Sequence, residues 1–348
     1  MFSISSIKNN LIGIMDTYDN IEEFYSVADI KEFPSNIKIN GVSSKGIKKI
    51  NLGEAILTRD IVKKIDCEKD LSFEVVDLRD ILKYKLAGAR GISDDFIALE
   101  IDTSIKLISN KTIMLEDDIE EGLFSYTYFT KIDFHHTNTS NISNMKNMFS
   151  SCKATSLDLS SFNTSNVKTM EGMFTHCHAT FLDLSNFDTL NVKKMEGMFK
   201  DCHATFLDLS SFDTSNVWNM LGMFAHCHAT SLDLSSFNTS NVMEMASMFE
   251  YCNATSLDLR SFDTSNVRNM GYMFKVCNAT SLDLSSFDTS NVVNMQCMFW
   301  GCQAISLDLS NFDTSSVKDM SYMFDKYSGT IKSIDDRLLL EYGSRRLN

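Results

Sequence analysis

The sequence is dominated by a repeat with a constant period of 25 residues. The triplet Leu-Asp-Leu begins at residues 157, 182, 207, 232, 257, 282 and 307, and the related triplet Ile132-Asp133-Phe134 comes one period earlier. Each unit reads approximately LDLSSF(D/N)TSNVxxMxxMFxxCxATS. A period kept from residue 132 to residue 331 predicts a stack of similar coils, each of which is stable only against its neighbours.

Two apolar patterns alternate within each unit. Leu157 and Leu159 flank Asp158, which is the alternation of a strand with one buried face. Further on, a stripe at positions i, i+3, i+6, i+7 and i+10 has the spacing of a short helix. In one unit this stripe comprises Val167, Met170, Met173, Phe174 and Cys177.

The junction between the two patterns also favours a helix start. Asp188 is a good N-cap residue, and Phe187 and Val192 stand where a hydrophobic staple places its two apolar residues. Strands linked through helices form a parallel sheet with right-handed crossovers. The expected fold is therefore an α/β solenoid of eight coils with one parallel sheet, about 40 Å long.

The unit LDLSSFDTSNVxxMxxMFxxC resembles the repeat of the BspA-like leucine-rich-repeat proteins, which are similar to the Treponema-type class. The resemblance covers roughly residues 132 to 324. It implies a right-handed stack of the leucine-rich-repeat type and a protein-binding role that is often adhesin-like and at the cell surface. The first twenty residues, MFSISSIKNNLIGIMDTYDN, lack a small-residue cleavage pattern and make a poor secretory signal. The compartment therefore stays open between cytoplasm and cell surface.

The two ends of the chain lack the repeat. Residues 1–131 are expected to form an α+β unit that caps or assists the solenoid, with a helix over Glu54 to Ile65 and a hairpin over Ile105 to Leu115. Residues 332–348 are expected to form a carboxyl-terminal cap, because Ile334 to Tyr342 has an amphipathic helical pattern. The three predicted parts are thus 1–131, 132–331 and 332–348.

An acidic column is predicted on the solvent face of the sheet, with one aspartate per coil. Like charges about 4.8 Å apart repel by about 1 kcal/mol for each pair, so we expect hydrogen bonds from the nearby serines, bound cations or a basic partner to offset them. If the column stays unpaired, folding should raise the pKa values. The column comprises Asp133, Asp158, Asp183, Asp208, Asp233, Asp258, Asp283 and Asp308.

One cysteine recurs in each coil, and histidines cluster beside three of them. Buried cysteines usually act as small apolar residues, so core packing is the expected role. Disulfides or a bound metal are the alternatives, and zinc is the metal considered because imidazole and thiolate are good zinc ligands. The cysteines are Cys152, Cys177, Cys202, Cys227, Cys252, Cys277 and Cys302, and the alternative metal ligands are His176, His178, His203, His226 and His228.

Positions that vary between coils are the expected binding residues. Aromatic residues and arginine are enriched at binding hot spots, and Phe181 and Phe206 occupy neighbouring outward strand positions. Exposed single aromatic residues are also common without a function. The candidates are Phe181, Phe206, Trp218, Arg260, Tyr272 and Trp300.

These observations favour a non-enzymatic protein that binds a protein or a glycan. A net charge of −14 disfavours nucleic acid, and no apolar stretch approaches the ~20 residues that span a bilayer. No phosphate loop, HExxH motif or nucleophile elbow occurs, so neither catalysis nor a cofactor is expected. The alternative is a cytoplasmic or delivered inhibitor or effector that binds a basic protein such as a nuclease. A third hypothesis places an enzyme in residues 1–131. The sequence does not indicate the partner or the oligomeric state.

Overall fold

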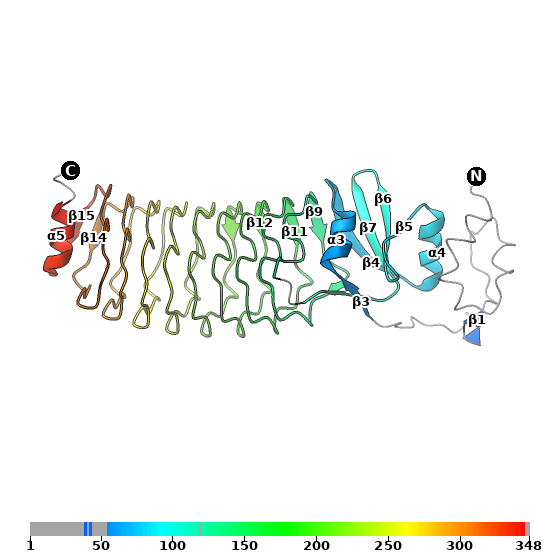
Figure 1. Cartoon of the computed structure of the whole chain (residues 1–348), viewed down its shortest axis with the longest axis horizontal. Helices are drawn as coiled ribbons and strands as arrows, with labels where there is room; N and C mark the ends of the chain where they lie inside the picture. The colour runs from blue at the N-terminus through cyan, green and yellow to red at the C-terminus, as the bar shows by residue number, and fades with distance from the viewer. Residues whose placement is uncertain (1–37, 40–41, 44–53, 118–119, 345–348) are drawn as a thin grey trace.

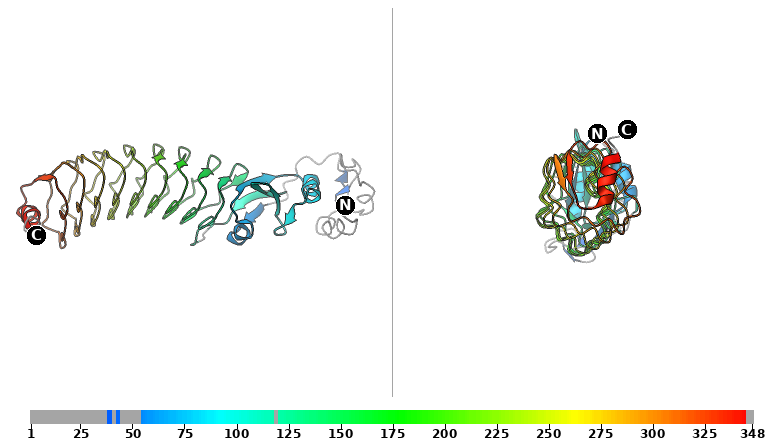
Figure 2. Two further views of the ribbon diagram at one scale, coloured as in Figure 1. Left: turned by 90° about the horizontal axis from the view of Figure 1, so that it is seen from above. Right: turned by 90° about the vertical axis from the view of Figure 1, so that its left-hand side faces the viewer.

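The protein is an elongated rod of stacked coils (Figure 1). The computed structural model describes residues 38–39, 42–43, 54–117 and 120–344. One hydrophobic core runs along the rod from Ala55 to Leu338, and the coils superpose when viewed along the long axis (Figure 2). The stretch before residue 38, where the sequence predicts no secretory signal, lies outside the described residues.

The amino-terminal unit extends the solenoid sheet. Its strand β4 pairs in parallel with the first coil strand β9, and β7, β6 and β5 continue the same sheet to its edge. A short antiparallel pair, β1 and β2, precedes this sheet. The elements are β1 (Lys38–Ile39), β2 (Val42–Ser43), β3 (Glu54–Leu57), α3 (Arg59–Ile65), β4 (Asp70–Val75), α4 (Leu78–Leu86), β5 (Arg90–Gly91), β6 (Ile97–Ile101), β7 (Ser104–Ser109), β8 (Thr112–Leu115) and β9 (Lys131–Asp133).

Two predictions for this unit are corrected. The helix expected over Glu54 to Ile65 is a strand followed by a helix, because Thr58 caps α3 by accepting a hydrogen bond from the Ile61 N–H. The hairpin expected over Ile105 to Leu115 does not form. Strand β7 pairs with β4 and β6, whereas β8 pairs in parallel with β3 and with β10 (Thr137–Asn138), so the chain turns a corner between two sheets.

The strand side of the coils forms a long parallel ladder. Strands β11 (Ser156–Asp158), β12 (Phe181–Leu182) and β13 (Phe206–Leu207) follow β9 in order. Isolated parallel bridges join Leu232 to Leu257 and Leu257 to Leu282, and β14 (Ser306–Asp308) pairs with β15 (Thr330–Lys332). The predicted repeat solenoid with a parallel sheet is confirmed to this extent.

The predicted short helix in each coil is wrong. Residues 170–177 form consecutive turns, in which the Met173 N–H donates to Met170 O and the Cys177 N–H donates to Phe174 O. Gly172 and His176 have φ values of 61° and 53° at the third position of these turns, as type II turns require. The described solenoid residues therefore contain no helix before α5, and the α/β description is corrected to strands and turns.

Alternate N–H groups of this turn segment all donate to the next coil. In one coil the donors are Met170, Gly172, Phe174 and His176, at 2.8–3.0 Å from carbonyls of Lys194, Glu196, Met198 and Lys200. The same direction recurs along the stack. The coils are thus joined by two ladders, one of strands and one of turns.

The second turn after each strand is also fixed by a side chain rather than by a helix. Asp188 Oδ1 accepts a hydrogen bond from the Leu190 N–H at 3.1 Å, which makes an Asx turn, and no helix begins at this aspartate. Thr189 is buried and bridges coils, because its hydroxyl donates to Asp213 O and accepts from the Asp213 N–H, both at 2.8 Å. Two residues further on, Asn191 Nδ2 donates to Ser165 O at 2.8 Å. The threonine and asparagine of the TSN motif therefore join neighbouring coils.

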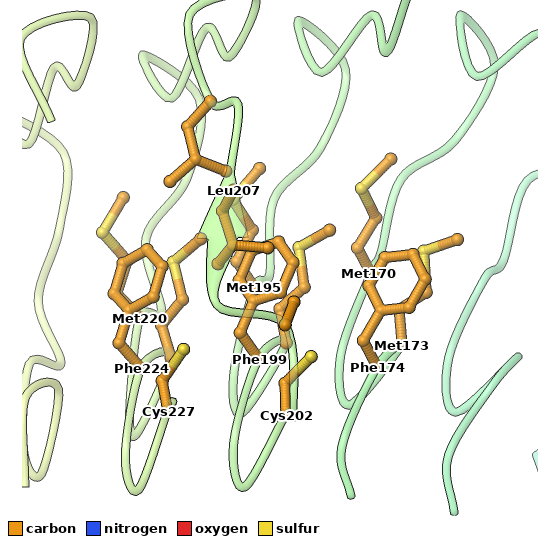
Figure 3. Close-up of a cluster of buried hydrophobic side chains, with 14 of the residues drawn as sticks. Met170, Met173, Phe174, Met195, Phe199, Cys202, Leu207, Met220, Phe224 and Cys227 are labelled. Atoms are coloured by element: carbon orange, nitrogen blue, oxygen red, sulfur yellow. The ribbon is translucent and has the colours of Figure 1, made fainter. Parts of the chain in front are cut away.

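The core contains a column of stacked phenylalanine rings. Phe174, Phe199 and Phe224 follow one another with ring centroids 5.7 and 5.6 Å apart and interplanar angles of 6° and 8° (Figure 3). Offset stacking at this spacing is favourable beyond the burial of the rings. The column runs through all eight coils and one further ring before them, and comprises Phe124, Phe149, Phe174, Phe199, Phe224, Phe249, Phe274, Phe299 and Phe324.

The turn ladder presents carbonyl groups at its amino-terminal end and N–H groups at its carboxyl-terminal end, and a different side chain caps each end. At the amino-terminal end the Arg59 guanidinium donates to Leu123 O and Ser125 O at 3.0 and 2.9 Å. At the other end the Glu341 carboxylate accepts from the Tyr322 N–H. Glu341 belongs to α5 (Asp336–Ser344), which lies where the sequence predicts a helix. The division of the chain at residues 131 and 331 stays a prediction, because one core crosses both positions.

Candidate binding surface

The outward strand positions of two neighbouring coils carry a phenylalanine pair, Phe181 and Phe206. Their residues are paired in the parallel ladder of β12 and β13, and the side chains are 55% and 53% exposed. The rings stack with centroids 6.1 Å apart and an interplanar angle of 6°. Because Ser156 precedes the pair and Ser231 follows it at the same position of the repeat, the pair stands as an isolated apolar rib on a polar face.

The acidic column is hydrogen-bonded rather than unpaired. Asp158 Oδ1 accepts from the N–H and hydroxyl of Ser160 at 3.0 and 2.6 Å, and Asp183 makes the same pair of bonds to Ser185 at 3.1 and 2.7 Å. The Asx turn thus fixes each carboxylate within its own coil. Serine bonding is the offset that the structure favours among the alternatives.

These hydrogen bonds reverse the pKa shift expected for an unpaired column. The Ser160 and Ser185 hydrogen bonds lower the pKa of Asp158 and Asp183. Arg260 lowers the pKa of Asp258 to about 2, and Lys332 lowers that of Asp308 to about 2. The carboxylates are therefore held in the charged form, and the face stays acidic at neutral pH.

The histidines form two outward columns on the turn side of the early coils. His178, His203 and His228 are stacked, with successive ring centroids 4.5 and 4.8 Å apart. Asp201 lies between His176 and His226, at 3.8 and 3.9 Å from a ring nitrogen of each.

The alternative zinc site is not assembled. The intervening Cys177 and Cys227 are fully buried in the core, so their thiols face away from the outward imidazoles. Rings that are stacked in parallel also direct their nitrogen lone pairs along parallel lines rather than toward one ion. Within the described ranges, no three His, Cys, Asp or Glu side chains are placed to hold a metal ion.

The other four candidate residues lie apart from the phenylalanine pair. Trp218 is half-buried, with the Lys194 ammonium 5.3 Å from its ring. Arg260 is exposed and donates to both carboxylate oxygens of Asp258, at 2.9 and 2.6 Å. Tyr272 and Trp300 belong to a separate cluster in the late coils.

This cluster is centred on a cation that sequence reasoning missed. The Lys275 ammonium lies 5.4, 5.0 and 5.8 Å from the ring centroids of Tyr251, Tyr272 and Trp300, and 2.9 Å from a carboxylate oxygen of Glu250. The lysine thus occupies the space between the rings. Reading lysines as well as aromatic residues along the repeat columns would have found it, because Glu250, Lys275 and Trp300 are spaced by one period.

Comparison with known proteins identifies the repeat region. A family model described as "Mycoplasma protein of unknown function, DUF285" matches residues 118–237 and 218–336, which together make more than half of the chain. The chain belongs to the DUF285 family. No curated protein and no solved structure matches it.

The two DUF285 matches cover the solenoid and leave residues 54–117 outside. The two matched regions overlap at residues 218–237. Each region is nearly five 25-residue coils long. The match therefore shows that the solenoid consists of DUF285 repeats. The resemblance to leucine-rich-repeat proteins is a finer statement, which this match does not include.

The cysteine column of the DUF285 repeat belongs to the core. All seven cysteines of the column are buried and free, as core packing predicts. Burial raises the pKa of Cys202 to about 11, which keeps the thiol protonated. In the part of the chain that the structure describes, no helix is long and apolar enough to cross a membrane.

Proposed function

We propose that this DUF285 protein is a non-enzymatic binding protein that contacts another macromolecule through the strand face around the phenylalanine pair. The observation that carries the proposal is the exposure of Phe181 and Phe206, at 55% and 53%, on paired parallel strands. Rigid, exposed aromatic side chains contribute strongly to binding because they bury a large area at little entropic cost.

The neighbours of the pair favour a protein partner with basic groups. Asp183 and Asp208 lie two residues beyond Phe181 and Phe206 and continue the acidic column along the same face. Complementary charge fixes orientation and speeds association, while the apolar rib supplies affinity. A protein or glycan bound at a cell surface and an inhibited basic protein both remain within this proposal. A right-handed stack of the BspA-like leucine-rich-repeat type is proposed with it.

Site-specific photo-cross-linking in the source cells tests the contact. A photoreactive phenylalanine derivative replaces Phe206 in one version of the full chain and Ser256 in a matched version. Ser256 occupies the same exposed strand position two coils later. We expect a discrete cross-linked partner from position 206 and little from position 256.

Equal cross-linking from the two positions would overturn the assignment of the surface. Applying protease to intact cells before cross-linking then separates the two settings, since a surface-exposed complex is digested and an internal one is protected.

A further inference from the structure

Five of the seven histidines lie on three consecutive coils, beside the phenylalanine pair. His178, His203 and His228 form the imidazole stack, with centroids 4.5 and 4.8 Å apart. The same repeat position is Asn253, Asn278 and Gln303 in later coils, so the fold does not require histidine there. The imidazole stack is therefore specific to the early coils.

The groups that face the stack disfavour its protonation. Lys153 Nζ lies 3.0 Å from His178 Nε2, and each ring lies against another imidazole. Burial, Lys153 and His203 lower the pKa of His178. Burial, His228, Lys153 and His176 lower the pKa of His203, and Asp201 opposes this. His178 and His203 are thus largely uncharged at neutral pH.

The imidazole stack and the phenylalanine pair are close enough to be covered by one segment of a partner. His178 and Phe181 are three residues apart on one coil, and His203 and Phe206 repeat this on the next, so each α-carbon pair is separated by at most about 11 Å. Asp183 lies two residues beyond Phe181. On these two coils the surface therefore presents an imidazole, an apolar ring and a carboxylate in order along the chain.

We propose that this surface binds a polypeptide segment with alternating apolar and basic side chains at neutral pH and releases it at mildly acidic pH. The inference rests on the proposed function and adds the chemistry of the partner and its regulation. The apolar side chains cover Phe181 and Phe206, and the basic side chains face the aspartates.

The sign of the pH dependence follows from two effects that act together. Covering an imidazole with a partner removes water and stabilises its neutral form, so binding is strongest above the histidine pKa and weakens as pH falls through it. Protonated imidazoles also repel the basic side chains of the partner. Asp183 stays charged over the same range, because its serine hydrogen bonds lower its pKa.

The test uses the full chain and a fluorescent synthetic peptide of alternating leucine and lysine. A leucine–glutamate peptide and a serine–lysine peptide are the controls. Two variants exchange residues for those of the same columns in other coils: Phe181→Ser with Phe206→Ser, and His178→Asn with His203→Asn and His228→Asn. Serine and asparagine already occupy these positions in folded coils, which preserves the backbone.

We expect the leucine–lysine peptide to bind the unmodified chain at about pH 7.5 and to bind at least about tenfold more weakly at about pH 5.5, because one coupled proton changes affinity up to tenfold per pH unit. The asparagine variant should keep the affinity at the higher pH and lose most of the dependence. The serine variant should bind weakly at both.

The failures are distinguishable. Unchanged binding by the serine variant overturns the proposed contact surface itself. Loss of binding by the serine variant, with full pH dependence kept by the asparagine variant, overturns only the role of the imidazole stack. Absence of leucine–lysine binding at about pH 7.5, or tighter binding of the leucine–glutamate peptide at about pH 5.5, overturns the partner chemistry and leaves the cross-linking experiment to decide the surface.

Discussion

The early and late coils of the solenoid use outward aromatic side chains in different ways. In the early coils Phe181 and Phe206 stack on each other and remain more than half exposed. In the late coils Tyr272 and Trp300 surround Lys275, which is itself paired with Glu250. Aromatic side chains therefore form an open surface in one region and pack around a cation in the other. Residue type alone does not identify a binding site; the neighbours on adjacent coils decide.

The largest difference in stability between the two regions should appear when Lys275 is replaced. Replacing Lys275 with alanine leaves the Glu250 carboxylate, only 17% exposed, without its ion pair and uncovers three rings, which should lower the free energy of unfolding by about 2 kcal/mol. Urea unfolding followed by circular dichroism measures the loss.

The matched control is Lys200→Ala, at the same repeat position in an early coil, where the lysine is exposed. Its effect should stay within about 0.5 kcal/mol. Equal losses for the two variants would contradict the contrast between the regions.

A second, smaller effect should appear in binding rather than in stability. Phe181→Ser with Phe206→Ser should weaken the cross-linked complex at least about tenfold and leave the unfolding midpoint nearly unchanged, because exposed side chains contribute little to folding. Trp300→Ala should do the reverse, lowering stability by about 1–2 kcal/mol with binding intact. Titration of purified partner and urea unfolding measure the two quantities on each variant.

The smallest effect concerns the acidic column. The pKa values of Asp158, Asp183 and Asp258 are lowered by folding, so their contribution to stability is present above about pH 4 and is lost as pH falls toward about 2. The thermal midpoint should therefore fall across this range. Thermal unfolding at a series of pH values checks it.

Arg260→Ser sharpens the comparison, since serine is the residue of the same position in most coils. It should raise the pKa of Asp258 from about 2 toward the values of the serine-bonded aspartates, as followed by NMR of the carboxyl carbon. An unchanged pKa would show that the guanidinium does not set it.

The coil period and the core were predictable because they depend on local alternation. Leu157 and Leu159 are buried on either side of Asp158, as the strand pattern predicts, and the cysteine column is buried as its residue type predicts. Identical units placed at a constant interval stack in register, so one unit predicts the core of all of them.

The helix prediction failed because consecutive turns reproduce helical spacing. The turn segment buries Met170, Met173 and Cys177. These residues are three and four positions apart, which is also the spacing along one face of a helix. Glycine at residues 172, 197 and 222 is the signal that favoured turns, because a left-handed residue recurs there.

The candidate surface was predictable only in part. The pairing of Phe181 with Phe206 follows from the period, because equivalent residues of neighbouring coils lie side by side. The role of Lys275 and the stacking of His178 on His203 depend on side-chain directions across coils, which one unit read alone does not contain. Reading each column along the whole stack recovers such contacts.

The direction of the turn ladder has a consequence for the size of the molecule. Along the turn ladder every coil donates to one neighbour and accepts from the other, while Arg59 and Glu341 contact the two ends of this ladder. A coil can therefore be duplicated or deleted between the two caps without changing either junction. Duplication or deletion within the gene can therefore change the length of the rod in steps of 25 residues. Each step moves the two capped ends apart or together by the thickness of one coil.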